Sequence, residues 1–168
     1  MENEEIITEK QLADIFATIN SIEACKEFTN FVYTNVNKLT QELYQRAEGL
    51  NIERFLLPVG NDGMNSEGAS RATTKGTPQD DTMDWQESFV GYTKLMIKAI
   101  NYLSQYAPVD VVVIQGNHDH ERMFYAGEVL SAWYTTDKNV TVDNSIEGRK
   151  YYEYGTNMIM FTHGDKEK

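Results

Sequence analysis

The segment Val109–Gln115, with the sequence VDVVVIQ, constrains the fold of this chain more than any other part of it. Apolar β-branched residues run through it almost without interruption, which is typical of a strand buried on both faces of a sheet. Helical patterns lie on either side, because apolar residues recur every three or four positions after Asp84 and again over Glu121–Tyr134. This alternation of helix and strand predicts an α/β domain.

Shorter segments complete the expected fold. One more strand is expected at Phe55–Val59, and Pro58 places its end near a sheet edge or a strand terminus, because proline has no N–H to donate. Three short strands follow the last helix, and a turn containing Gly155 joins the final two; they are predicted over 139–142, 150–154 and 157–162. Together these elements predict a layered α/β fold with a mixed sheet flanked by helices.

The first 49 residues are predicted to be helical. Thr8 and Gln11 form a capping box at the start of a first helix, and the apolar residues of 21–47 recur at helical spacing up to Gly49, which suits a C-terminal cap. A chain of 168 residues is expected to form one domain. We therefore describe it as an N-terminal helical segment, 1–49, followed by an α/β domain, 50–168.

Composition excludes several classes of function. With 15 basic and 26 acidic residues the formal net charge is −11, so a basic surface that coats nucleic acid is not expected. The single cysteine excludes a cysteine zinc site, and no apolar run suits a membrane span or a signal peptide. We expect a soluble, cytoplasmic protein with no membrane partner. Divalent cations held by carboxylates would still allow an acidic protein to act on phosphate esters.

Small polar clusters follow three of the predicted strands. Asp62 comes after the first strand, Asn117, His118 and Asp119 come after the central one, and His163 comes after the last. In layered α/β folds ligands bind at strand ends, where turn residues face a cleft. A carboxylate, an amide oxygen and neutral imidazoles suit Mn, Zn or Fe. The clusters therefore predict a divalent metal site.

The clusters resemble motifs of the calcineurin-like metallophosphoesterases. Gly116–Asp119 is similar to the family's Gly-Asn-His-Asp/Glu motif, Gly60–Asp62 to its Gly-Asp motif with one Asn inserted, and Thr162–Gly164 to its later histidine. The resemblance extends from about Gln45 to the C-terminus. It is strongest to phage-type and DNA-repair-exonuclease-like members, on the segments 59–65, 77–80 and 149–155.

The resemblance implies a role for each matching residue. Asp62 would bridge two metal ions, and Asn117 and His163 would ligate the second of them. His118 would contact the phosphate or protonate the leaving oxygen, and Asp119 would orient His118. The implied activity is metal-dependent hydrolysis of phosphomonoesters or phosphodiesters, with nucleic acid among the candidate substrates.

The same residues also have structural interpretations. In the loop after the first strand, Asn65 and Arg71 are candidates for binding the substrate phosphate, or else solvated side chains. Gly116–Asp119 is also compatible with a strand-to-helix turn whose Asp caps the next helix. A hairpin turn would account for Asp62 alone, and a strand-end hydrogen bond would account for His163 alone.

Two motifs of the family do not occur in the chain. These are the first Asp-x-His and the last Gly-His-x-His, and the three histidines leave no substitutes for them. One metal would then have Asp62 as its only ligand. We expect either a piece of a longer protein or a degenerate member: a phosphoesterase in its complete form, weakly active here. The alternative is a non-catalytic domain that keeps the fold and serves an interaction role.

The absence of the Asp-x-His segment also has a consequence for association. In the family that strand lies beside the one expected at Phe55–Val59, so its absence would leave an unpaired sheet edge. Such an edge is a template for another chain. We therefore expect a homodimer or a domain-swapped oligomer.

Overall fold

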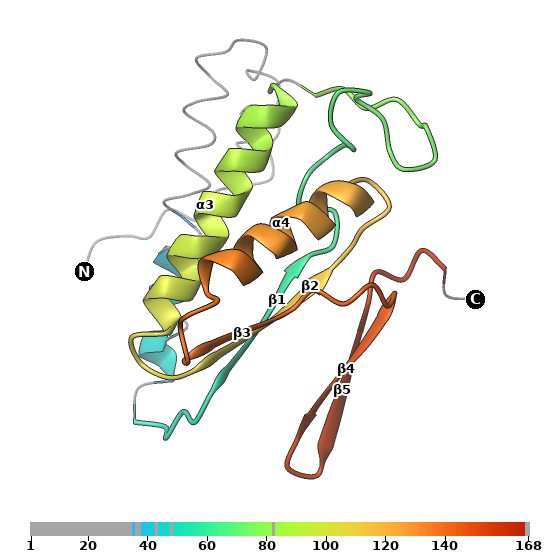
Figure 1. Cartoon of the computed structure of the whole chain (residues 1–168). Coiled ribbons are helices and arrows are strands. Elements are labelled where there is room, and N and C mark those ends of the chain that lie inside the picture. Colours follow the sequence, from blue (N-terminus) through green and yellow to red (C-terminus); the bar gives the residue numbers. More distant parts are fainter. Residues whose placement is uncertain (1–34, 36–37, 43, 48, 82, 167–168) are drawn as a thin grey trace, which may run out of the picture.

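A parallel three-stranded sheet lies at the centre of the protein, in a computed structural model that describes residues 35, 38–42, 44–47, 49–81 and 83–166. In this sheet β2 (Val109–Ile114) lies between β1 (Phe55–Gly60) and β3 (Val140–Asp143) (Figure 1). The register pairs Gly60 with Ile114, so β1 and β2 end at the same edge of the sheet.

Two helices, α3 (Trp85–Leu103) and α4 (His120–Trp133), cover one face of this sheet (Figure 1). Alternate residues of β2 point toward them because side chains along a strand alternate between its two faces. The core cluster joins this strand to both helices, and its fully buried members include Val109, Val111, Val113, Ile100, Met123 and Leu130. Each such side chain contributes roughly 1.5–3 kcal/mol of transfer free energy, which holds the helices on the sheet.

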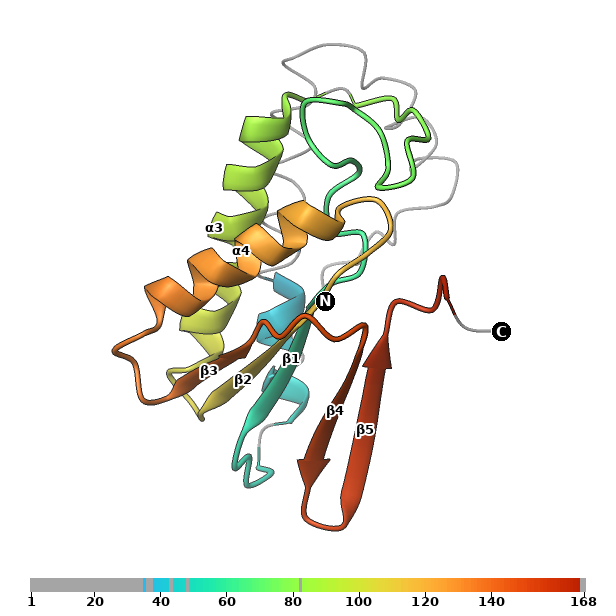
Figure 2. The same ribbon diagram turned by 45° about the vertical axis from the view of Figure 1, so that its right-hand side comes forward.

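A second layer covers the other face. β4 (Arg149–Tyr154) and β5 (Asn157–Thr162) form an antiparallel hairpin on the side of the sheet away from the helices (Figure 1, Figure 2). Asp110 links the layers, because its carboxylate accepts from the Tyr152 hydroxyl at 2.6 Å and pairs with Arg54 at 2.6 Å. Burial alone would raise the pKa of Asp110, but the hydrogen bonds that it accepts and the Arg54 charge outweigh burial and lower it.

The strands from 55 onward and α4 lie within one residue of their predicted bounds, and α3 begins after Asp84 as predicted. The prediction of a single mixed sheet was wrong. The parallel and antiparallel strands belong to separate sheets, because the hairpin packs on the face of the parallel sheet and not at its edge. Among the strands that the structure describes, β1 lies at the edge of its sheet. Residues 38–42 and 44–46 are helical, while the predicted helix start at Thr8 and most of the 21–47 helix lie outside the described residues.

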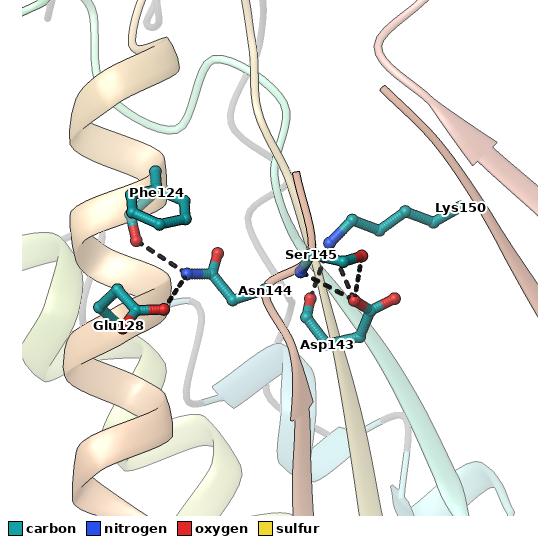
Figure 3. Close-up of polar contacts among 6 residues, drawn as sticks. All are labelled: Phe124, Glu128, Asp143, Asn144, Ser145 and Lys150. Atoms are coloured by element: carbon teal, nitrogen blue, oxygen red, sulfur yellow. Dashed lines mark hydrogen bonds and ion pairs between the residues drawn. The ribbon is translucent and has the colours of Figure 1, made fainter. Parts of the chain in front are cut away.

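Asn144 joins the end of β3 to α4 (Figure 3). Its Nδ2 donates to the backbone oxygen of Phe124 at 3.0 Å and to the Glu128 carboxylate at 2.9 Å. On the neighbouring residue, the backbone oxygen and the carboxylate of Asp143 accept from the buried Lys150 ammonium at 2.9 and 3.2 Å. This junction therefore ties the sheet to α4 on one side and to the hairpin on the other.

Gly127 makes room for the Asn144 amide, because a Cβ on this glycine would lie 2.0 Å from Asn144 Oδ1. Alanine normally stabilises a helix by up to about 1 kcal/mol relative to glycine. Here Gly127→Ala would displace the amide and break two hydrogen bonds worth roughly 1 kcal/mol each. We predict that it lowers the free energy of unfolding by about 1 kcal/mol, measured by urea denaturation.

The matched control is Gly148→Ala, since nothing lies within 4 Å of a Cβ at this position. Its effect should stay within about 0.5 kcal/mol. In the Asn144→Ala background the sign should reverse, so that Gly127→Ala becomes neutral or stabilising. A stabilising effect of Gly127→Ala in the otherwise unchanged chain would contradict this account of the junction.

Candidate functional site

The ends of β1, β2 and β5 bring three of the predicted residues together. The carboxylate of Asp62 accepts a hydrogen bond from the backbone N–H of His118 at 2.9 Å. The imidazole Nε2 of His163 lies 2.6 Å from Asn117 Oδ1 and 3.6 Å from Asp62 Oδ2. Asp62, Asn117 and His163, from three separate parts of the chain, therefore form one cluster, which we call the strand-end cluster.

The backbone conformation at the end of β1 lets Asp62 come close to the turn after β2. Gly60, Asn61 and Asp62 all have positive φ, at 106°, 59° and 65°, a conformation that asparagine and aspartate tolerate better than other non-glycine residues. Two glycines have no space for a side chain here. A Cβ on Gly60 would lie 2.1 Å from the backbone oxygen of Ile114 in β2, and a Cβ on Gly116 would lie 2.0 Å from Asp62 Oδ1.

The inserted Asn61 has a role that the sequence analysis missed. Its Oδ1 lies 2.5 Å from Nδ1 of His163, on the opposite side of the ring from Asn117. If Nδ1 carries the proton and donates to Asn61, the Nε2 lone pair faces the Asn117 oxygen at 2.6 Å. An Nε2 lone pair can accept from the Asn117 amide once its oxygen and nitrogen are exchanged, or it can bind a cation. No pattern in the sequence pointed to this contact. In the structure its sign is the positive φ of two consecutive non-glycine residues, Asn61 and Asp62.

The donor atoms of the strand-end cluster fit a single divalent cation. Two ligands at about 2.1 Å from a metal and at right angles to each other are about 3.0 Å apart, and the separations of 2.6 and 3.6 Å bracket this value. The bond from Nδ1 to Asn61 is the kind of outer contact that orients a ligating histidine. Within the described ranges no three His, Cys, Asp or Glu side chains form a metal-holding group, so a cation at this cluster would need the Asn117 amide as its third ligand.

His118 is held by a partner other than the expected one. Its Nδ1 lies 3.0 Å from the backbone oxygen of Asn65, and because a carbonyl only accepts, Nδ1 carries the proton. Nε2 is then the nitrogen available for proton transfer. The expectation that Asp119 orients His118 was wrong, because the buried Asp119 carboxylate instead accepts from the backbone N–H of Met64 at 2.7 Å.

Asp119 is a buried carboxylate with an incomplete set of partners. Within the described structure its Oδ1 makes no hydrogen bond of normal geometry, although the Gly116 backbone is near enough to help lower the pKa of the carboxyl. Burial raises the pKa of Asp119 to about 6; the Met64 hydrogen bond opposes this shift, and the negative charge of Asp62 adds to it.

The loop between β1 and α3 is folded. The side chains of the two candidate phosphate-binding residues, Asn65 and Arg71, bond to other residues of this segment. Asn65 donates from its side chain to Asp81 at 2.6 Å. Arg71 faces Asp81 and Asp84 and is more than half exposed, so the structure does not bring it to the strand-end cluster. Glu67 accepts from the backbone N–H of Glu121 at 3.0 Å, which ties the loop to α4.

A cleft of about 440 Å³ opens beside the strand-end cluster. The end of β2, the hairpin and the segment after β5 form its walls, and Asn117 and His163 line it. Six charged side chains also line it: Lys75, Arg149, Lys150, Lys166, Glu147 and Asp165. Four cations against two anions make this wall more positive than the chain as a whole, whose net charge is −11.

Comparisons with protein-family models, with curated proteins and with solved structures each return no match for this chain. Among the described residues, no helix has the length and apolar character that crossing a membrane requires. The interpretation of the site therefore depends on the motifs and on the geometry that they adopt.

The burial of Asp119 predicts a pH-dependent stability. Its pKa is about 6 in the folded state and about 3.9 in an unfolded chain, so the folded state binds more protons between these values. The free energy of unfolding should then fall by up to about 3 kcal/mol as the pH rises from 4 to 7. Asp119→Asn cannot titrate and keeps an acceptor for Met64, so it should remove most of this dependence and stabilise the protein at pH 7.5.

This prediction is checked by urea denaturation at pH 4, 5, 6 and 7.5 in the presence of a chelator. Asp84→Asn is the control, because the Asp84 side chain is 72% exposed. If Asp119→Asn destabilised the protein equally at every pH, Asp119 would be ionised in the fold throughout this range.

Proposed function

We propose that the strand-end cluster binds a divalent cation and that the chain belongs to a metal-dependent phosphoesterase of the calcineurin-like type. The observation that carries this proposal is the convergence of Asp62, Asn117 and His163 at one sheet edge, with His118 anchored on the same Asp62 carboxylate. The proposed reaction is hydrolysis of a phosphomonoester or phosphodiester, with nucleic acid among the candidate substrates.

The residues divide the work of this reaction. Asp62, Asn117 and His163 would hold the cation, which when bound polarises a phosphoryl oxygen and lowers the pKa of water. In its imidazolium form His118 would donate the Nε2 proton to the leaving oxygen and be left as the neutral Nδ1–H ring, because its Nδ1 is engaged by Asn65. Since His118 and the metal ligands share Asp62, the acid and the cation keep a fixed relation to each other.

The cleft supports an anionic substrate. Its four basic side chains lie in an otherwise acidic protein, so the electrostatic potential at this wall would attract the negative charge of a phosphate ester. Two of these cations already have carboxylate partners, Lys75 with Asp165 at 3.8 Å and Lys150 with Asp143 at 3.2 Å. The cleft therefore supports attraction of the substrate more than tight charge pairing.

We predict one Mn²⁺ site and a trace of Mn²⁺-dependent turnover. Calorimetric titration should give one site in the unchanged chain, weakened at least about ten-fold by His163→Ala or Asp62→Asn. Hydrolysis of bis-p-nitrophenyl phosphate should remain well below about 1 per second, because among the described residues Asp62 alone is available to a second cation. His118→Ala should abolish this turnover and leave Mn²⁺ binding unchanged.

His120→Ala is the matched control, because His120 lines the same cleft but is not a member of the strand-end cluster, and it should change neither measurement. Anomalous diffraction from Mn²⁺-soaked crystals should place the ion among the three cluster residues. An ion elsewhere, or turnover at ordinary rates that survives His118→Ala, would refute the proposal.

An interaction role is the second candidate, and the hairpin favours it. Within the described residues β5 pairs only with β4, and its sequence, NMIMFT, carries no charge. Edge strands are usually protected by lysine, proline or a bulge. Met158 and Met160 are 65% and 50% exposed, and Tyr151 lies beside Met160 across the hairpin. This apolar edge would serve a homodimer or a domain-swapped oligomer.

Association through this edge predicts a mass of twice 19.3 kDa by light scattering at micromolar concentration. Met160→Lys should shift the protein to the monomer, because a charge at the edge opposes strand pairing. Val90→Lys, at a half-exposed position on α3, is the control and should leave the mass unchanged. A monomeric mass for the unchanged chain would rule out this mode of association.

A further inference from the structure

Arg122 is a buried arginine in the first turn of α4 that the proposed reaction does not use. Its residue is only 4% exposed. One terminal nitrogen donates to the backbone oxygen of Ser66 at 2.5 Å, and the other donates to the backbone oxygen of Trp85 at 2.9 Å. The guanidinium therefore bridges the loop after β1 and the start of α3.

A buried guanidinium is costly, so its retention requires compensation. The carboxylates of Asp119, Asp81 and Glu67 are near enough to stabilise its charge. The two bonds are also geometrically specific, because two nitrogens of the planar guanidinium reach two carbonyls that are far apart in the sequence. Lysine, with one nitrogen, could not reproduce it.

The segment that Arg122 holds is the one that orients His118. Three consecutive loop residues each bond to the β2–α4 turn or to the first turn of α4. The Met64 N–H donates to Asp119, the Asn65 oxygen accepts from His118, and the Ser66 oxygen accepts from Arg122. The Met64 and Arg122 bonds are both buried, whereas the bond between Asn65 and His118 is exposed, so the exposed bond lies between two that are shielded from water.

We propose that Arg122 is a positioning residue of the phosphoesterase site, which holds the Asn65 carbonyl against His118 and so keeps the imidazole proton on Nδ1 and Nε2 free for proton transfer. This inference depends on the proposed function for its catalytic meaning. The tautomer of His118 can nevertheless be measured without metal or substrate, so a failure of the inference is distinguishable from a failure of the proposed function.

The test is long-range ¹H–¹⁵N NMR of the histidine rings at a pH where the imidazoles are neutral, in the presence of a chelator. In the unchanged chain His118 should be the Nδ1–H tautomer. In Arg122→Gln and Arg122→Lys it should shift toward Nε2–H, with the smaller shift in the lysine variant. Asn65→Ala is the matched control, because it keeps the backbone carbonyl and should keep the tautomer.

A second readout separates positioning from general stability. Mn²⁺-dependent turnover should fall about ten- to a hundred-fold in Arg122→Gln, with Mn²⁺ affinity and KM unchanged. An unchanged His118 tautomer in a folded Arg122→Gln protein would overturn the proposal. If neither Arg122 variant folds, the unchanged chain still decides, since an Nε2–H tautomer there would overturn it as well.

Discussion

The parallel pairing of β1 and β2 is the constraint on which the rest of the structure depends. Six consecutive residue pairs fix the register and bring Gly60 opposite Ile114, so the two strands end side by side at the same edge of the sheet. The two turns then meet closely enough that a Cβ on Gly116 would collide with Asp62. A shift of one residue would turn the apolar residues of β1 to the other face and separate the turns.

A second layer of bonds converts this proximity into a defined site. The first turn of α4 is held to the loop after β1 by Asp119, and also through Glu67 and Arg122. The Asp119 and Arg122 bonds are buried, so each of them costs more to break than a surface bond, whereas the Glu67 bond is exposed. The loop is therefore part of the framework around His118, although its sequence has the Gly, Ser and Thr content of a flexible linker.

The two halves of the proposed site differ in what supports them. Asp62 and Asn117 follow strands of the central sheet, whereas His163 follows a hairpin that contacts the sheet through polar groups such as the Tyr152 hydroxyl. The hairpin also exposes much of its apolar surface, including Met158. The hairpin thus leads into His163 of the strand-end cluster and also exposes the apolar surface proposed for association, and the two proposed roles do not exclude each other.

The sequence by itself determined the elements and the three polar clusters, because periodicity, proline and glycine positions and the run of valines are local properties of the chain. Tertiary structure alone decided which groups meet. The hairpin packs on the face of the sheet, Asn61 contacts His163, and a backbone carbonyl orients His118 where a carboxylate was expected. Backbone groups are the same at every residue and bonds such as that from Arg122 to Ser66 span more than fifty positions, so neither leaves a pattern that sequence can reveal.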